Sequence, residues 1–508
     1  MPNNVQIVLD KRMSETLTNL DVVVGSVHLM LTSEESIANI QIKLEGIAQS
    51  TLQIAKHPNK KNDKSKKTVS EIHKLLYLTE TLFPPSDVRQ LGSGTTGKDG
   101  FTLAPGRYQY PFEFRIPVNN DCTDTKNFIS KLTESTDAKK HISATLPPSC
   151  DDTEFATIKY FFKVTVKKAA FYKMNMRTYY PFVFLPIEPP RPPPAEIQTF
   201  FARRKHRFAY TPVSRSSHHL LAKKKKGFFS SFGSSASKAS AGVLQQPGPV
   251  IYLEARLPEP RIMVPTRPID LTLVVCSQTK LDVEVYMHSI SVNLLTTTIS
   301  RVDAYSQENT MTLAVSHMQQ LKLATSQSTN PQPGIYEAEF DRRRFSGLYL
   351  PNTVPPSFKT CNIERTYALE IVAELSHGST GPREYIELSF PIQVWSGIEP
   401  PPALLEALSN DAANPYLAAS AEHQRIENSP QQYPQQAQQQ PNPHDIYSDG
   451  NISDYGPPQA AVPEDPASLP TYNEVIAARV KPVQGPRRTY EQSPTYFANV
   501  DALDNDKN

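Results

Sequence analysis

Residues 36–50 read SIANIQIKLEGIAQS, and this stretch decides the fold class because its apolar residues alternate with polar ones. A β-strand with one buried face would turn Ile37, Ile40, Ile42 and Leu44 toward a core. No long amphipathic helical pattern stands on either side of it. We therefore predict a half-buried β-strand here, of the kind found in all-β sandwiches.

Similar patterns extend outward from this strand in both directions and predict two sandwiches. The first covers residues 1–188, and the second begins near 248 and ends near 397. Their clearest strand patterns are VVVGSVHLML (22–31), YQYPFEFRIP (108–117), ATIKYFFKVTVKKA (156–169), IDLTLVVCSQ (269–278), LDVEVYMHSISVNLLTTTISRV (281–302) and REYIELSFPIQVW (383–395).

Two segments have a composition that disfavours a packed core. Between Ile197 and Leu253 there are ten Lys or Arg residues and no Asp or Glu, and the segment includes a Ser-rich run. We predict a disordered linker over 189–247, since such a segment buries too little apolar surface to offset its ordering entropy. Residues 398–508 are predicted to be a disordered tail after a short helix near ALLEALSN (403–410), because seven of the ten residues in 431–440 are Gln.

Charge and cysteine usage exclude several classes of protein. A net charge of +2 over 508 residues gives no overall polycation, so no nucleic-acid partner is expected. The absence of a CxxC pair argues against a zinc site and a disulfide framework, and favours a reducing compartment. The N-terminus lacks a secretory signal pattern and no apolar run reaches membrane-span length, so we predict a cytoplasmic protein. The cysteines are Cys122, Cys150, Cys276 and Cys361.

Residues 92–99, GSGTTGKD, superficially resemble a nucleotide-binding loop. Such a loop leaves a strand and opens a helix, whereas a turn and a strand pattern follow here. Asp99 also stands where a magnesium-binding hydroxyl is required. We predict a hairpin loop, with no catalytic residues, cofactor or metal.

The order of several segments resembles the arrestin superfamily, specifically the fungal α-arrestins, or arrestin-related trafficking adaptors. The resemblance rests on VVVGSVHLML, IANIQIKLEGIAQ, LAPGRYQYPFEFRIP and TLPPSC with ATIKYFFKVTVKK, and in the second block on NIERTYALEIVAEL with YIELSFPIQVW. It implies two arrestin-like, immunoglobulin-type β-sandwich domains in tandem. One departure is Asn19-Leu20-Asp21, where the family usually has Pro-Gly-Asp.

The resemblance also gives a meaning to SLPTYNEVI in the tail. The family recruits HECT-type ubiquitin ligases, whose WW domains bind PPxY or LPxY motifs. A WW domain presents an aromatic-lined groove to a polyproline II segment. The WW-binding residues are then Leu469, Pro470 and Tyr472, with Val475 packing alongside, although a four-residue match also arises by chance.

A second, degenerate motif, SPTY, contains Pro494 and Tyr496. The family role implies an adaptor that brings the ligase to cytosolic segments of membrane transporters or receptors, so that the cargo is ubiquitylated and endocytosed. The expected location is cytoplasmic, peripheral to the plasma membrane or endosomes. The alternative is a signalling or retromer-like sorting scaffold that recruits no ligase.

Two lysine-rich runs allow further readings. The run NKKNDKSKK is either a solvated charge cluster or a set of ubiquitin acceptors: Lys60, Lys61, Lys64, Lys66 and Lys67. The second run suits an anionic membrane surface, a nuclear import signal or a solubilising linker, and phosphorylation of Ser230, Ser231 and Ser234 would offset its charge. Its membrane-binding residues would be Lys223, Lys224, Lys225, Lys226, Phe228 and Phe229.

Overall fold

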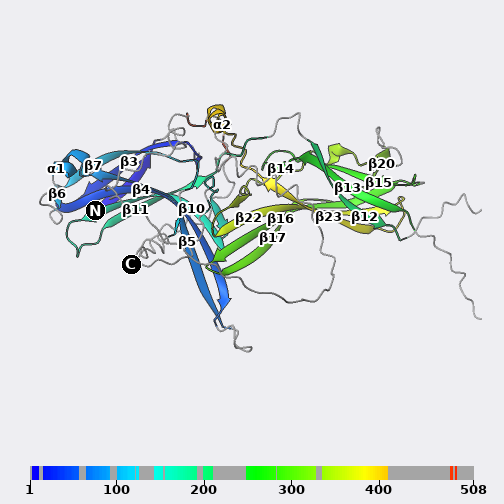
Figure 1. Cartoon of the computed structure of the whole chain (residues 1–508), viewed down its shortest axis with the longest axis horizontal. Helices are drawn as coiled ribbons and strands as arrows, with labels where there is room; N and C mark the ends of the chain where they lie inside the picture. Colours follow the sequence, from blue (N-terminus) through cyan, green and yellow to red (C-terminus); the bar gives the residue numbers. More distant parts are fainter. Residues whose placement is uncertain are drawn as a thin grey trace, which may run out of the picture. The chain divides into compact units, whose positions relative to one another are not determined.

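The described part of the chain is built almost entirely of β-strands, as predicted (Figure 1). No helix among the described residues is long and apolar enough to span a membrane. The computed structural model describes residues 3–10, 15–56, 65–91, 100–120, 122–124, 142, 144–152, 155–191, 198–209, 248–281, 283–327, 335–409, 481–483 and 487–488.

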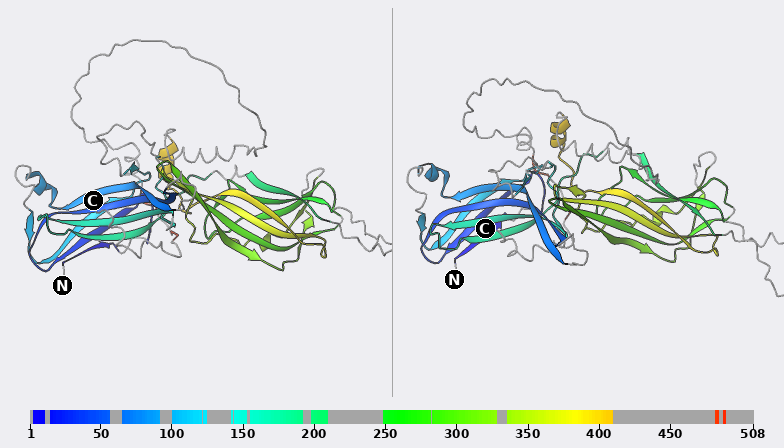
Figure 2. Two further views of the ribbon diagram at one scale, coloured as in Figure 1. Left: turned by 90° about the horizontal axis from the view of Figure 1, so that it is seen from below. Right: turned by 60° about the horizontal axis from the view of Figure 1, so that its bottom comes forward.

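The first sandwich has two sheets, drawn in blue to cyan in Figures 1 and 2. Within the described ranges the smaller sheet has the order β1-β3-β7 and the larger has the order β2-β11-β10-β4-β5-β8, with β6 paired to β4 and β9 to β10. The strands are β1 (Asn4–Leu9), β2 (Thr16–Leu17), β3 (Val22–Leu31), β4 (Glu35–Ala55), β5 (Lys66–Phe83), β6 (Phe101–Leu103), β7 (Gly106–Arg115), β8 (Thr123–Asp124), β9 (Cys150–Asp152), β10 (Ala156–Lys168) and β11 (Met176–Phe184).

The second sandwich, in green to yellow, also has two sheets (Figure 2). In its described residues one sheet has the order β12-β13-β15-β20-β19 and the other β14-β23-β22-β16-β17, with β18 paired to β16 and β21 to β22. The strands are β12 (Gln198–Arg207), β13 (Val250–Glu259), β14 (Ile262–Met263), β15 (Thr272–Ser277), β16 (Val285–Val302), β17 (Tyr305–Met318), β18 (Leu323–Ala324), β19 (Ser326–Gln327), β20 (Tyr336–Glu339), β21 (Phe358–Lys359), β22 (Ile363–His377) and β23 (Glu384–Val394).

Three short helical segments complete the described elements. A helix, α1 (Ser86–Leu91), follows β5, and a 3₁₀ turn, η4 (Arg342–Arg344), follows β20. The predicted helix after the second sandwich is α2 (Pro402–Ser409). It belongs to a separate unit of the chain, residues Pro401–Lys481.

The first core lies between the two sheets of its sandwich. The alternating residues of β4 are fully buried, with no exposed area at Ile37, Ile40, Ile42 and Leu44. Aromatic rings from the opposing sheets meet in the middle: the Phe112 ring of β7 lies 5.8 Å from the Phe162 ring of β10, centroid to centroid. Period-two spacing thus delivers one apolar face per strand to the core.

Gly46 of β4 allows one close approach inside this core. A Cβ atom at this position would lie 2.6 Å from Cε1 of Tyr160 on β10. The Tyr160 ring packs against Phe184 with centroids 4.7 Å apart, and its hydroxyl donates to the carbonyl oxygen of Pro147 at 2.7 Å. The ring is therefore held in the space that a larger residue would need.

Part of the predicted disordered linker is a strand, and this corrects the prediction for residues 198–207. Strand β12 pairs antiparallel with β13 along its whole length, from Gln198 opposite Glu259 to Arg207 opposite Val250. The segment itself has no acidic residue, but Glu254 of β13 binds the Arg203 guanidinium at 2.6 Å. The Glu254 carboxylate, 51 residues away from Arg203, therefore offsets part of the positive charge on which the prediction of disorder was based.

Candidate functional site

The turn before β3 is held by several side-chain hydrogen bonds. The Asn19 side-chain amide donates to the carbonyl oxygens of Pro117 and Val118, each at 2.9 Å, and its oxygen accepts from the Ile187 amide at 2.9 Å. Leu20 is fully buried with φ of 70°. The family's usual glycine at this position would adopt that left-handed conformation without strain, so Leu20 is held there by its surroundings.

Asp21, the next residue, is bound by an arginine from far along the chain. Arg487 donates through Nη2 to Asp21 Oδ1 at 2.7 Å and through Nη1 to the other carboxylate oxygen. Arg487 Nη1 also donates to the Thr16 carbonyl oxygen at 3.2 Å. The pair is almost completely removed from water, with 10% of the Arg487 side chain and 5% of the Asp21 side chain exposed. We call Asp21 and Arg487 the tail anchor, since they fix the segment around Arg487 to the first sandwich.

The loop between β10 and β11 presents apolar side chains to solvent. Phe171 is 99% exposed, Met174 is 88% exposed and Tyr172 is 75% exposed. Three large apolar residues on one loop tip form an exposed feature of the kind that marks interaction sites. We call Phe171, Tyr172 and Met174 the apolar loop.

Glu35 holds the base of the apolar loop. Its carboxylate accepts from Lys173 Nζ at 2.8 Å and from Lys168 Nζ at 3.1 Å. The hydrogen bond from Lys173 lowers the pKa of Glu35, burial opposes this shift, and Lys168 lowers the pKa further. Glu35 therefore stays ionised and fixes Lys173, which stands between the exposed residues Tyr172 and Met174.

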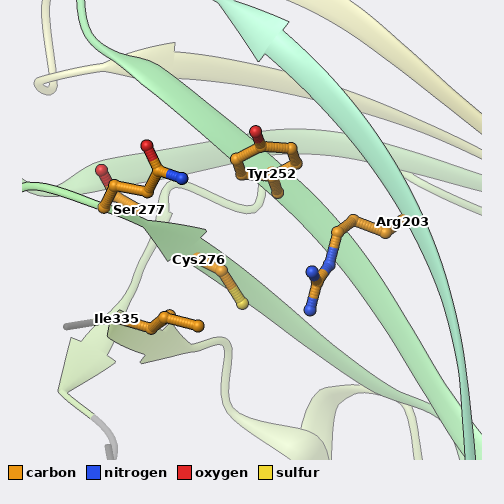
Figure 3. A pocket seen from close by; sticks show the side chains of 6 residues that line it. Arg203, Tyr252, Cys276, Ser277 and Ile335 are labelled. Atoms are coloured by element: carbon orange, nitrogen blue, oxygen red, sulfur yellow. The ribbon is translucent and has the colours of Figure 1, made fainter. Parts of the chain in front are cut away.

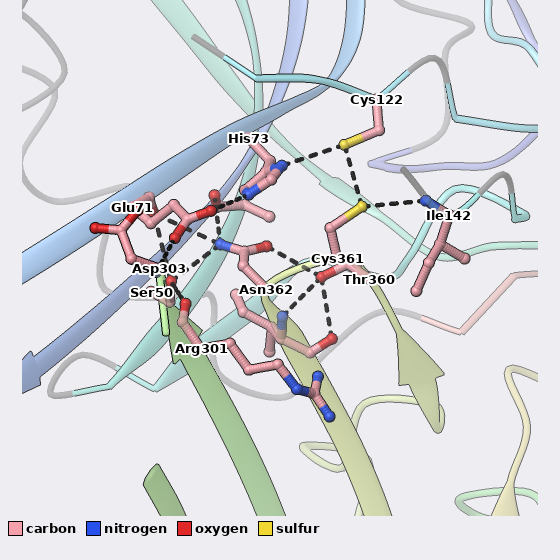
Figure 4. Close-up of polar contacts among 12 residues, drawn as sticks. Ser50, Glu71, His73, Cys122, Ile142, Arg301, Asp303, Thr360, Cys361 and Asn362 are labelled. Carbon is pink, nitrogen blue, oxygen red and sulfur yellow. Dashed lines mark hydrogen bonds and ion pairs between the residues drawn. The ribbon is translucent and has the colours of Figure 1, made fainter. Parts of the chain in front are cut away.

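Buried polar groups connect the strands of the two sandwiches (Figure 4). The Asn362 side-chain amide, just before β22, donates to the Ala48 carbonyl oxygen at 3.1 Å and to Ser50 Oγ at 3.2 Å. The Ser50 hydroxyl of β4 donates in turn to the Arg301 carbonyl oxygen at 2.6 Å. These bonds replace water for groups that would be costly to bury alone.

A pocket of about 320 Å³ opens in the second sandwich (Figure 3). Burial first, and the nearby Glu254 and Glu337 carboxylates next, raise the pKa of the Cys276 thiol to about 11. Cys276 is therefore protonated at neutral pH and is a poor nucleophile. The pocket is lined by Arg203, Tyr252, Cys276, Ser277, Gln278 and Ile335.

The elements on either side of residues 92–99 occur in the reverse order from those around a phosphate-binding loop, which follows a strand and precedes a helix. Helix α1 ends just before the segment, and strand β6 follows it and pairs with β4. A phosphate-binding loop needs its helix afterwards, where the helix N-terminus faces the phosphate. The segment itself lies outside the described residues.

Most of the predicted site residues also lie outside the described residues. Lys66 and Lys67 are described, and both are exposed at the start of β5. The others are the WW-binding residues Leu469, Pro470, Tyr472 and Val475, the second motif Pro494 and Tyr496, the linker residues Lys223, Lys224, Lys225, Lys226, Phe228 and Phe229, and the acceptors Lys60, Lys61 and Lys64.

Sequence reasoning missed the tail anchor and a group of potential metal ligands. No local signal marks the anchor, because Asp21 is the residue that the family pattern also has, and the sequence around Arg487 does not indicate a partner. Among the described residues, His73, Cys122 and Cys361 gather their ligand atoms within 4.8 Å of one another. They come from three separate segments, so no short spacing pattern reveals them.

Comparison with known proteins agrees with this architecture. The profile of the arrestin (or S-antigen) N-terminal domain matches residues 5–185, which contain the first sandwich. The arrestin-related trafficking adapter 10 of Lachancea thermotolerans is 30% identical over 127 residues, 24% of this chain and 29% of that relative. These matches support the predicted assignment to the α-arrestin family. The predicted tandem β-sandwich fold is confirmed. The match spans less than a third of the relative's length, so what that relative's name says of its role is not transferred directly.

Proposed function

We propose that this protein is a trafficking adaptor that links membrane transporters or receptors to a WW-domain HECT-type ubiquitin ligase, promoting cargo ubiquitylation and endocytosis. The family match supports an adaptor role. The LPTY motif at 469–472 supports ligase recruitment and is the observation that carries the proposal. A sorting scaffold without a ligase has no need of that motif.

The tail anchor gives the motif a defined neighbourhood. Fifteen peptide units separate Tyr472 from Arg487, and a fully extended chain of that length spans about 50 Å. A ligase bound at LPTY is thereby kept near the first sandwich. A short tether of this kind raises the effective concentration of the ligase at cargo held by the same molecule.

The apolar loop supplies a surface for the cargo side of the adaptor. Phe171 and Tyr172 project from a loop whose base is fixed by Glu35, so ordering them on a partner costs less entropy than ordering a mobile segment. We assign this loop to contact with the cytosolic, membrane-proximal segment of the cargo. Replacing Phe171 and Tyr172 together by Ser should reduce cargo capture while leaving WW binding intact.

The lysine runs have secondary roles in the proposal. Lys66 and Lys67 are exposed, as acceptors of ubiquitin must be. Ubiquitin-remnant mass spectrometry would find the modification there or show that it lies elsewhere.

The four lysines at 223–226, together with Phe228 and Phe229, bind anionic membranes, and each Lys near the surface contributes about 1 kcal/mol to membrane binding. Sedimentation with anionic liposomes that is insensitive to salt would contradict this role.

The ligase contact is tested by binding the full chain to a panel of isolated WW domains. Tyr472→Ala and Pro470→Ala should each weaken the strongest interaction at least tenfold, because they empty the two recognition positions of the groove. Tyr496→Ala serves as the matched control in the degenerate motif and should have a smaller effect. Unchanged binding of Tyr472→Ala would leave the adaptor without its ligase contact.

A further inference from the structure

Three side chains with metal-ligating atoms meet beside the polar contacts that join the two sandwiches (Figure 4). Cys122 Sγ lies 3.4 Å from His73 Nδ1 and 3.5 Å from Cys361 Sγ. His73 is buried on β5, whereas Cys122, between β7 and β8, and Cys361, between β21 and β22, are partly exposed.

Two of the three ligand separations are close to those around a tetrahedral zinc ion, and all three lie within 4.8 Å. Zn–S bonds of about 2.3 Å and Zn–N bonds of about 2.0–2.1 Å imply ligand separations of about 3.8 Å for two sulfurs and about 3.6 Å for sulfur and nitrogen. The observed 3.5 Å and 3.4 Å fall within about 0.3 Å of these values. In contrast, 3.5 Å is about 1.5 Å longer than a disulfide bond.

The surrounding hydrogen bonds prepare the histidine as a ligand. His73 Nε2 lies 2.7 Å from Glu71 Oε1. An ionised carboxylate can only accept, so His73 donates from Nε2 to Glu71, and its other ring nitrogen, Nδ1, faces Cys122 Sγ. A carboxylate behind the distal nitrogen is the arrangement that orients zinc-binding histidines. Glu71 is fixed in turn, because its Oε2 accepts from the Asp303 amide at 2.6 Å.

The sulfur of Cys361 also accepts a hydrogen bond from a backbone amide. The backbone amide of Ile142 donates to Cys361 Sγ at 3.2 Å. A metal-bound sulfur in this position would keep that N–H as its outer hydrogen-bond donor. The cluster therefore has both its ligands and their supporting contacts.

We propose that His73, Cys122 and Cys361 form a Zn²⁺ site with a fourth position open to water or an incoming ligand. Two thiolates and an imidazole suit zinc, whereas calcium and magnesium prefer oxygen ligands. The ion would join β5 of the first sandwich to the start of β22 in the second. The proposal differs from the expectation, drawn from the lack of a CxxC pair, that the chain has no metal site.

The first test uses the metal alone with the purified full chain, stripped of metals and kept reduced. Cobalt(II) should bind one equivalent, with the thiolate charge-transfer and intense ligand-field bands of a tetrahedral site, and Zn²⁺ should displace it. Cys122→Ser and Cys361→Ser should each weaken zinc binding at least tenfold, and Glu71→Gln should weaken it about 10- to 100-fold. Cys276→Ser is the control and should bind as the wild type does. No binding at micromolar zinc, or equal binding by Cys361→Ser, would overturn the proposal.

A second measurement needs no variant and so does not depend on variants folding. Zinc should slow the alkylation of Cys122 and Cys361 at least tenfold in the wild-type chain, followed residue by residue by mass spectrometry. The rate at Cys276 should not change. Equal rates at Cys122 with and without zinc would overturn the proposal, as would isolation of the reduced-purified protein with a Cys122–Cys361 disulfide.

Discussion

Arg487 forms a buried, bidentate salt bridge with Asp21, a residue 466 positions earlier in the chain. The contact reaches the turn whose Leu20 adopts a left-handed conformation. It ties the segment that follows the LPTY motif to the start of the first sandwich. The tail is therefore attached to the folded body at a point downstream of its proposed ligase-binding motif.

Breaking this pair should destabilise the first sandwich. Arg487→Gln leaves the buried Asp21 carboxylate without its cationic partner, so we expect the free energy of unfolding to fall by about 3 kcal/mol. Urea denaturation of the full chain measures the change, and hydrogen exchange should show residues 481–488 becoming unprotected.

An exposed pair provides the control for this measurement. Arg343 binds Asp341 at 3.1 Å, but 90% of the Arg343 side chain is in solvent. Arg343→Gln should leave the stability at the wild-type value, because solvent screens such pairs. If the two arginine variants behaved alike, the tail anchor would not stabilise the fold.

Gly46 should tolerate no side chain. Gly46→Val places a Cβ atom 2.6 Å from the Tyr160 ring, and overpacking of this kind costs about 1–3 kcal/mol or more. Thermal unfolding should detect the loss. Gly106→Ala, also in a strand, is the comparison: its Cβ would come no nearer than 3.8 Å to Tyr108, so it should be neutral or slightly stabilising. A neutral Gly46→Val would contradict the packing described for β4 and β10.

Glu35 should make stability depend on acidic pH. The hydrogen bond from Lys173 is the main cause that lowers the pKa of Glu35 in the folded chain. The stabilisation that ionised Glu35 provides is therefore fully present above its unfolded pKa of about 4.3. That contribution is lost as the pH falls through the lower folded value. The stability gap between the wild type and Glu35→Gln should therefore shrink between pH 6 and pH 3.

The neighbouring Glu34 provides the control, because it is exposed. Glu34→Gln should match the wild type at both pH values. Urea unfolding at pH 6 and pH 3 compares all three proteins. A Glu35→Gln gap that stays constant or widens on acidification would refute the assigned role of Glu35.

The strands could be predicted because alternation is a local property. The spacing of three between Ile37 and Ile40 breaks that alternation, and the structure explains it: the pairing of β4 with β10 shifts register at Lys167 and Lys168, so both isoleucines still reach the core. A bulge of this kind adds one residue without changing the buried face.

Features that depend on a distant partner could not be predicted from local composition. Strand β12 reads as a basic linker until Glu254 is placed beside Arg203. The proposed zinc ligands His73, Cys122 and Cys361 match no short spacing pattern, because they lie on three separate segments that meet only in the folded chain. The tail anchor is invisible for the same reason, since Asp21 and Arg487 lie near opposite ends of the sequence.

The most direct test of the adaptor proposal is a comparison of membrane-protein abundance and ubiquitylation in cells lacking this protein. Cells re-expressing the wild-type chain should lower the surface level of one or a few transporters or receptors and raise their ubiquitin-remnant signal. Cells expressing Tyr472→Ala at the same level should behave like the deletion. If Tyr472→Ala restored both cargo ubiquitylation and cargo removal from the surface, the claim that the LPTY motif recruits the ligase would be contradicted.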